Sequence, residues 1–367
     1  MKMTPRSISS PGKFLIASGL LDQLDEHLKV FGNNVLVVCD VFFLDRVSSS
    51  LAKGAKESGL NVNVEKFGGE CSAVEVDRLR QICTANNIEV VVGIGGGKTL
   101  DCAKAVSFYE NKPVVIVPTL ASTDAPCTAL SVLYKENGEF DKYLFLPKNP
   151  DAVLVDTQVI ANAPVRFFAA GVGDALATYF EARACFQADG INLVLKRPSR
   201  TGLGIARLCY DILQENIETA MDAVSSKVVT SALEQTIEAT IYLSGVGAES
   251  GGLAAAHAVS NGMSIVPELH RVQHGEKVTF GLLTQLVLEN APAEEIDSVI
   301  RIIKTAGLPL TLADMGLTTI DEKVWREVAK VACAEGDTMS NMPANLSEND
   351  VYAAMMAANA MGARYKA

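Results

Sequence analysis

Three of the four histidines in this sequence lie within a single segment, GLAAAHAVSNGMSIVPELHRVQHGEKV (252–278). They are His257, His270 and His274. Because imidazole nitrogens are common ligands of divalent metals, their grouping points to a metal site. His270 and His274 are four residues apart and would share one face of a helix, although Pro267 favours a loop or a helix start there. Taken alone, His257 or His274 is more typical of a buried core position than of a ligand.

Asp174 is the acid in the apolar stretch FFAAGVGDALATYF (167–180). A buried carboxylate is costly unless it is paired or bound to a metal. With His257 and His274 it would supply one oxygen and two nitrogens, a set of three ligands that leaves positions open on the metal. The alternative is structural: Gly171 and Gly173 break the helix, and Asp174 caps the helix that follows. Spacing does not decide between this ligand set and the local His270 and His274 pair.

A glycine loop, VVVGIGGGKTLDCAKA (90–105), follows a predicted strand and opens a predicted helix. Bare backbone N–H groups at a helix N-terminus favour an anion such as a phosphate. The loop is not a Walker A motif, because Val92 stands where that motif needs glycine. It also lacks the glycine spacing of the usual dinucleotide fingerprint, and the acid expected about 20 residues later.

Asp40 ends the predicted strand NVLVVCD (34–40). A carboxylate at that edge can accept hydrogen bonds from ribose hydroxyls and repels a 2′-phosphate, which favours NAD over NADP. The structural alternative is a capping Asp in a strand-to-helix loop. A second glycine turn, in KFGGECSAVEVDRLR (66–80), is predicted to be a simple turn with Ser72 as N-cap and Glu75 completing a capping box.

The elements that carry these residues differ between the two halves of the chain. Short β-branched runs predict buried strands at 34–40, 61–67, 89–96, 113–119 and 152–160, and helical stretches between the first four indicate a parallel α/β sheet. TALSVLYKENGEFDKYLFLP (128–147) predicts a hairpin that turns at Asn137 and Gly138. From residue 163 the apolar spacing is helical. We therefore predict an α/β domain at 1–162 and an all-α domain at 163–367.

Composition excludes several classes of partner. The 367 residues carry a formal charge of −11, which disfavours nucleic acid and anionic membranes. No apolar run approaches the roughly 18 residues of a membrane span, and the N-terminus lacks a signal peptide, so a cytoplasmic protein is expected. The eight cysteines contain no C-x-x-C pair, which argues against disulfides and a thiolate zinc site. A hydrophobic content of 49% favours a homo-oligomer.

Seven motifs together resemble the glycerol dehydrogenases of the iron-containing, or zinc-dependent, alcohol dehydrogenase superfamily. They are SPGKF (10–14), FGGECS (67–72), GIGGGKTLD (93–101), PTLASTDAPC (118–127), GVGDALATYFEARAC (171–185), GGLAAAHAVSNG (251–262) and HGEKV (274–278). The motifs follow one another over nearly the whole chain. The resemblance implies a dehydroquinate synthase-like architecture, in which a Rossmann-like N-terminal domain binds NAD and a helical C-terminal domain binds the metal, with the active site between them.

The same resemblance implies a role for each site residue. The residues that would bind the cofactor are Asp40 at the ribose, Gly97 and Lys98 at the pyrophosphate, and Thr119, Ser122, Thr128, Leu130 and Tyr134 around the rest of NAD. Asp124 would contact the polyol substrate. Asp174, His257 and His274 would hold one divalent metal, with zinc expected and iron as the alternative. His270 would be a neighbour of the site.

The implied reaction is NAD-dependent oxidation of the secondary hydroxyl of glycerol to dihydroxyacetone by an octameric enzyme. A dehydrogenase or reductase of another small diol, hydroxy ketone or 2-hydroxy acid is the first alternative, although Asp124 would repel a carboxylate. A metal-dependent hydrolase without a dinucleotide is a more remote one. The chain departs from the family pattern at Thr128, where serine is expected, and in FQADGINLVLKRPSRTG (186–202), which contains Lys196, Arg197 and Arg200.

Overall fold

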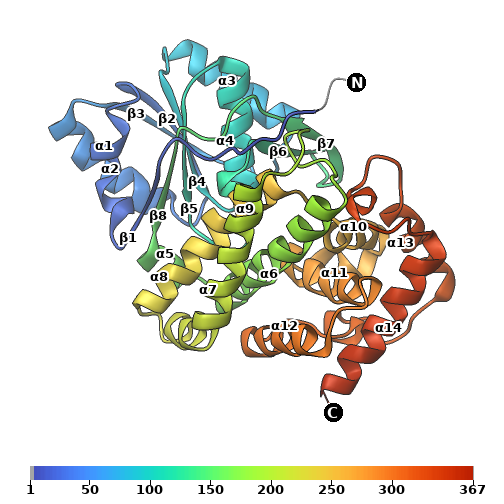
Figure 1. The fold of residues 1–367 in the computed structure, drawn as a ribbon. Coiled ribbons are helices and arrows are strands. Elements are labelled where there is room, and N and C mark those ends of the chain that lie inside the picture. The colour runs from blue at the N-terminus through green and yellow to red at the C-terminus, as the bar shows by residue number, and fades with distance from the viewer. Residues whose placement is uncertain (1–3, 367) are drawn as a thin grey trace. The chain divides into compact units, whose positions relative to one another are not determined.

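The computed structural model describes residues 4–366 and is drawn in Figure 1. The chain divides into two compact units. The first contains Ser9–Ala163 and Val224–Thr230. Of the described residues, the second contains 4–8, Pro164–Ala223 and 231–366. A single boundary near residue 162 therefore misplaces two short segments: residues 4–8 belong to the second unit, and Val224–Thr230 belong to the first. The roles predicted for the two domains stay predictions.

The first unit is built on a parallel sheet of six strands in the order β1-β8-β5-β4-β2-β3. The strands are β1 (Phe14–Ala17), β2 (Asn34–Cys39), β3 (Asn61–Lys66), β4 (Val90–Gly95), β5 (Val114–Pro118) and β8 (Ala152–Asp156). The central strands are valine-rich and buried along nearly their whole length, as expected for a sheet covered on both faces. The predicted parallel α/β sheet is confirmed.

Two details of the sheet differ from the prediction. The edge strand β1 was not predicted, because FLIA is only four residues long and buries alternate side chains only partly. The strand predicted at 152–160 ends at Asp156, whose side chain accepts the backbone N–H of Gln158 (3.0 Å) and Val159 (3.3 Å). This N-cap begins helix α5 (Thr157–Asn162) inside the predicted strand.

Helices cover both faces of the sheet, with α2 on one side and α3 and α4 on the other (Figure 1). The helices of this unit are α1 (Leu24–Leu28), α2 (Leu44–Ser58), α3 (Ala73–Ala85), α4 (Gly97–Glu110) and α5. The predicted hairpin is confirmed as the antiparallel pair β6 (Leu130–Tyr134) and β7 (Phe140–Phe145). Its turn contains Gly138 at a φ of 84°, a conformation that favours glycine.

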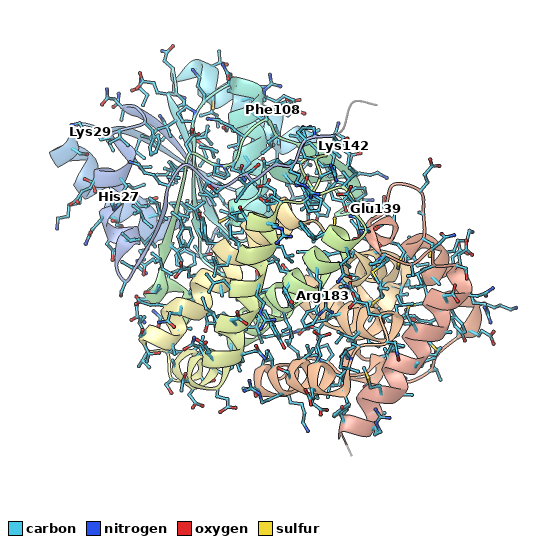
Figure 2. All side chains as sticks on the ribbon, viewed as in Figure 1. His27, Lys29, Phe108, Glu139, Lys142 and Arg183 are labelled. Carbon is cyan, nitrogen blue, oxygen red and sulfur yellow. The ribbon has the colours of Figure 1, made fainter. Side chains whose placement is uncertain are left out.

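The second unit is helical, as predicted. Its helices are α6 (Val165–Gln187), α7 (Arg200–Ser225), α8 (Ser231–Glu238), α9 (Ser244–Gly251), α10 (Ala255–Gly262), α11 (His274–Leu288), α12 (Ala293–Ala306), α13 (Glu322–Ala332) and α14 (Glu348–Lys366). A π-helix (Ala239–Leu243) joins α8 to α9. Trp325 and Phe280 pack edge to face in its core, 6.2 Å apart between ring centroids. Arg183 of α6, labelled in Figure 2, pairs with Glu295 of α12 at 2.6 Å.

Glycines bring α6 and α11 into close contact. A Cβ added to Gly275 of α11 would lie 1.8 Å from the carbonyl oxygen of Ala170 in α6. One added to Gly173 of α6 would lie 2.4 Å from Thr279 Oγ1 of α11. The structural alternative, in which Gly171 and Gly173 break the helix before Asp174, is therefore wrong: α6 continues through both glycines. At Gly173 the missing Cβ permits this packing. Asp174 lies inside α6 and does not cap a helix.

Among the described residues, no helix combines the length and the apolar character that crossing a membrane requires.

Candidate functional site

Three helices of the second unit bring Asp174, His257 and His274 together. Asp174 comes from the middle of α6, His257 from the first turn of α10, and His274 is the first residue of α11. Asp174 Oδ1 lies 3.4 Å from Nε2 of each histidine, and the two Nε2 atoms lie 3.3 Å apart. Within the part of the chain that the structure describes, this is the one group of three His, Cys, Asp or Glu residues arranged to hold a metal.

The spacing of these three donor atoms fits a small divalent cation. An ion bound tetrahedrally at about 2.0–2.1 Å holds its ligand atoms about 3.3–3.4 Å apart, which is the length of each side of the observed triangle. Two imidazole nitrogens and one carboxylate oxygen also form a typical set for a catalytic metal, which keeps further positions for substrate. The ligand roles predicted for these residues remain a prediction, and this geometry supports it.

The electrostatics of the cluster also favour a cation. Burial alone would raise the pKa of Asp174, but the adjacent His274 and His257 hold that pKa well below its usual range. Burial likewise opposes a charge on His257, yet the carboxylates of Glu181 and Asp174 raise the pKa of this imidazole well above its ordinary value. Positive charge is therefore stabilised at this point, and a bound divalent ion would supply it in place of protons.

His270 lies outside the cluster. It belongs to the 3-10 helix Pro267–Arg271, is exposed, and has its Nε2 atom 3.2 Å from the carbonyl oxygen of Ser264. That helix ends before α11 begins at His274, so the two histidines do not share a helical face. The alternative of a local metal site on one helix is therefore wrong.

In the first unit, the glycine loop joins β4 to α4 and leaves the start of that helix open. Gly96 is the N-cap residue and has no side chain to cap the helix. A Cβ added to Gly96 would meet nothing closer than 3.5 Å, and one added to Gly97 nothing closer than 4.0 Å. The N–H groups of an uncapped first turn, together with the helix dipole, attract anions. The loop thus fits the predicted phosphate site.

The other predicted cofactor residues lie near the carboxyl ends of the parallel strands, where ligands of open α/β sheets bind. Asp40 follows β2, and its Cβ would lie 3.0 Å from a Cβ added to Gly95. Its Oδ1 accepts the backbone N–H of Phe42 at 3.1 Å, a local turn contact that leaves Oδ2 for a ribose hydroxyl. Thr119 follows β5 and donates its N–H to the carbonyl of Gly95 at 3.0 Å.

The remaining predicted residues lie on the segment after β5 and on the hairpin. Ser122 and Asp124 are half-buried in the loop that leads to β6, Thr128 is buried, and Leu130 and Tyr134 are the ends of β6. Tyr134 contacts the glycine loop, because Lys98 Nζ lies 4.7 Å from the centroid of its ring. The structure thus brings the predicted cofactor residues into one region of the first unit, although their contacts with NAD stay predictions.

Comparison with known proteins identifies the family. Residues 11–157 match the family model of the iron-containing alcohol dehydrogenases. A glycerol dehydrogenase of Escherichia coli is 51% identical to this chain over 360 residues, which is 98% of each chain. The chain belongs to the iron-containing alcohol dehydrogenase family. A glycerol dehydrogenase of Thermotoga maritima is 48% identical over 96% of both chains. The crystal structure of glycerol dehydrogenase from Schizosaccharomyces pombe, at 34% identity, superposes with a TM-score of 0.94 over 100% of this chain and 93% of that one.

In this member of the family, a carboxylate that was not predicted from the sequence orients one predicted ligand. Glu181 is fully buried on α6, and its Oε2 lies 2.6 Å from His257 Nδ1. Its Oε1 accepts the backbone N–H groups of Ala254 and His257, both at 2.8 Å. Glu181 thereby caps the start of α10 and directs His257 Nε2 toward Asp174. The spacing of seven residues between Asp174 and Glu181, two turns on an apolar helix, was the available signal.

A buried lysine supports the loop that carries the other predicted contacts. Lys104 of α4 is 1% exposed, pairs with Asp101 at 2.9 Å, and donates to the carbonyl oxygens of Ala125 (2.9 Å), Thr128 (3.4 Å) and Leu130. An ammonium has three donors and no acceptor, so these carbonyls and one carboxylate satisfy it without water. Lys104 therefore fixes the backbone between Asp124 and β6.

We expect Glu181→Gln to weaken metal binding by about 10–100-fold, as is typical when a partner of a histidine ligand is lost. The amide is close in shape, but it is neutral and no longer stabilises the imidazole as the carboxylate does. Equilibrium dialysis with metal analysis measures the change. Glu289→Gln, which alters a carboxylate that pairs with Arg183 of α6 at 2.7 Å, is the control. Unchanged metal affinity in Glu181→Gln would show that Glu181 only caps α10.

Proposed function

We propose that this protein is a glycerol dehydrogenase that oxidises the secondary hydroxyl of glycerol to dihydroxyacetone and reduces NAD. The observation that carries the proposal is the triangle of donor atoms from Asp174, His257 and His274, in a chain whose relatives of about half identical sequence bear this name. A set of three ligands with open positions suits an enzyme that must bind an alcohol oxygen directly.

The chemistry follows from what oxidation of an alcohol requires. The hydroxyl must lose its proton as its carbon gives up hydride, and a divalent cation at the three ligands would favour the deprotonated oxygen. Asp174 and the two histidines would hold that cation, and Glu181 would keep the tautomer of His257 that leaves Nε2 free to bind it. The donor spacing of 3.3–3.4 Å suits the bond lengths of zinc, which is our proposed metal.

NAD is the proposed hydride acceptor. The uncapped start of α4, at Gly97 and Lys98, would bind the pyrophosphate, and Asp40 would accept hydrogen bonds from the adenosine ribose. Thr119, Ser122, Thr128, Leu130 and Tyr134 would line the rest of the cofactor. Binding in this way orients the nicotinamide, which supplies the hydride chemistry itself.

Asp124 is proposed to select the substrate. An anionic acceptor can take a hydrogen bond from a hydroxyl of glycerol, but it repels the carboxylate of a 2-hydroxy acid. A neutral polyol is therefore the proposed substrate class. We also propose a homo-oligomer, on the basis of the 49% hydrophobic content and the family resemblance, and light scattering on the purified protein tests it.

The test is NADH formation by the purified, metal-loaded protein on a panel of substrates. Glycerol with NAD is expected to give the highest kcat/KM among glycerol, 1,2-propanediol and lactate. A higher value for lactate would overturn the choice of a neutral polyol. No NADH with any alcohol, together with hydrolysis of an ester or amide, would favour the metal hydrolase instead.

The nucleotide preference makes a separate prediction about Asp40. A carboxylate near the ribose repels a 2′-phosphate, so Asp40→Ser should reduce the preference for NAD over NADP by at least about tenfold. The measurement is kcat/KM for both nucleotides with saturating glycerol. Asp45→Asn, which removes an acid from the first turn of the adjacent helix α2, controls for net charge. Equal use of NAD and NADP by the unaltered protein would show that Asp40 does not face the ribose.

A further inference from the structure

The turn FGGECS (67–72) contains an acid that binds the lysine of the glycine loop. Glu70 lies between β3 and α3, and Lys98 lies in the first turn of α4. Lys98 Nζ is 2.7 Å from Glu70 Oε1 and 2.6 Å from Oε2, so both carboxylate oxygens bind one ammonium. The Glu70 side chain is 30% exposed and the Lys98 side chain 43% exposed, so a ligand can reach both from solvent.

The carboxylate of Glu70 points away from the turn's own hydrogen bonds and binds Lys98 instead. A different acid forms the contacts of the turn: Glu75 is buried, accepts the backbone N–H of Gly68 at 2.9 Å, and pairs with Arg78 at 2.8 Å. Ser72 caps the following helix by accepting the N–H of Glu75 at 3.2 Å. Within the described part of the chain, the Glu70 side chain forms its hydrogen bonds with Lys98. The internal contacts of the turn therefore do not depend on the Glu70 carboxylate.

A pyrophosphate bound at Lys98 would compete with this carboxylate. The lysine ammonium is a compact charge with three donors, and both oxygens of Glu70 already lie against it. A phosphate brought to the same ammonium either displaces Glu70 or lies beside it, where like charges repel. Both outcomes lower the affinity for the dinucleotide relative to an unpaired lysine.

We propose that Glu70 is a competing anion for Lys98, which weakens dinucleotide binding and speeds release of the reduced cofactor. The inference rests on the proposed function, because it requires the pyrophosphate to bind at Lys98. Without a dinucleotide, Glu70 neutralises the lysine; when the dinucleotide binds, the lysine exchanges one anion for another. Because the lysine loses one anion as it binds the other, the net free energy of dinucleotide binding is smaller. The reduced cofactor therefore dissociates faster.

The experiment is a fluorescence titration of the full-length, metal-loaded protein with NADH, together with stopped-flow measurement of NADH release. Glu70→Gln is expected to bind NADH about threefold to tenfold more tightly and to release it more slowly by a similar factor. The difference should shrink as salt is added, because the groups are partly exposed. The matched control is Glu110→Gln: Glu110 ends the same helix α4, pairs with Arg80 at 2.8 Å, and gives the same change in net charge.

The same Glu70→Gln substitution is also measured in a protein that carries Lys98→Met. In that background Glu70→Gln should raise the NADH affinity by no more than about twofold, because the lysine for which the anions compete is absent and only weak repulsion between partly exposed groups remains. An equal gain in Glu110→Gln, a gain of undiminished size without Lys98, or no gain at all would overturn the inference. If the unaltered protein binds no NADH, the proposed function fails instead, and the two failures are thereby distinguished.

Discussion

We expect His257→Ala to lose both its metal and its turnover, while His270→Ala keeps both. His257 Nε2 forms one corner of the donor triangle, 3.4 Å from Asp174 Oδ1 and 3.3 Å from His274 Nε2. Removing one of three ligands should weaken binding far more than the roughly 10–100-fold typical of an outer partner. Loss of the cation removes several kcal/mol of stabilisation from the developing alkoxide, so turnover should fall by about a thousandfold or more.

The measurement is metal content after dialysis, followed by the rate of NADH formation. Asp174→Ala should behave as His257→Ala does, and both variants should still bind NADH, because the predicted cofactor residues belong to the other unit. Treatment with a chelator should abolish activity reversibly in the unaltered protein. Metal retained by His257→Ala and lost from His270→Ala would contradict the assignment.

The sheet could be predicted from the sequence because its central strands are dense β-branched runs. β2, β4 and β5 are buried over most of their length, and such runs are typical of strands covered by helices on both faces. Asp156 shows the limit of this reasoning. The apolar pattern that precedes Asp156 continues to Ile160 and therefore predicted one long strand. In the structure the Asp156 side chain caps helix α5, and apolar spacing carries no information about such a capping contact.

The candidate metal residues could be proposed from their chemistry, but their arrangement depends on packing between helices. Spacing left Asp174 as either a helix cap or a ligand. In the structure α6 continues past Asp174, and Gly173 and Gly275 lie where a Cβ would clash with the facing helix. His270 and His274 looked equivalent in sequence, yet a helix end separates them. Such contacts join segments about a hundred residues apart in the sequence. The periodicity of apolar residues along one segment does not predict them.

Charged pairs between distant segments were the least predictable part. Glu70 and Lys98 are 28 residues apart and belong to motifs that the sequence presents separately. Lys104 was equally hidden, because a lysine in a helix is ordinarily exposed, whereas this one is buried beneath the loop of residues 125–130. Lys98 and Lys104 both contact loops around the proposed cofactor site. These contacts join separate motifs, so no single motif predicts them.

Asp124→Asn should lose polyol turnover while keeping metal and NADH binding. An anionic acceptor for a substrate hydroxyl becomes a neutral group that both donates and accepts, and a hydrogen bond to a charged group contributes about 1.5–3 kcal/mol. The expected loss in kcat/KM for glycerol is therefore about 10–100-fold. The backbone that carries Asp124 should stay in place, because Lys104 holds the carbonyl of the next residue, Ala125, at 2.9 Å.

The controls separate substrate recognition from damage to the loop. Asp141→Asn removes an exposed acid from β7 of the same unit and should leave kcat/KM unchanged. Thermal unfolding of Asp124→Asn identifies a folding defect, and unchanged NADH affinity shows that the cofactor residues of the loop keep their positions. If the residue selects neutral polyols by repelling carboxylates, turnover of lactate should rise relative to glycerol in Asp124→Asn. Full activity on glycerol with an unchanged ratio would remove Asp124 from substrate recognition, because neither its hydrogen bond to the polyol nor its repulsion of a carboxylate would then contribute.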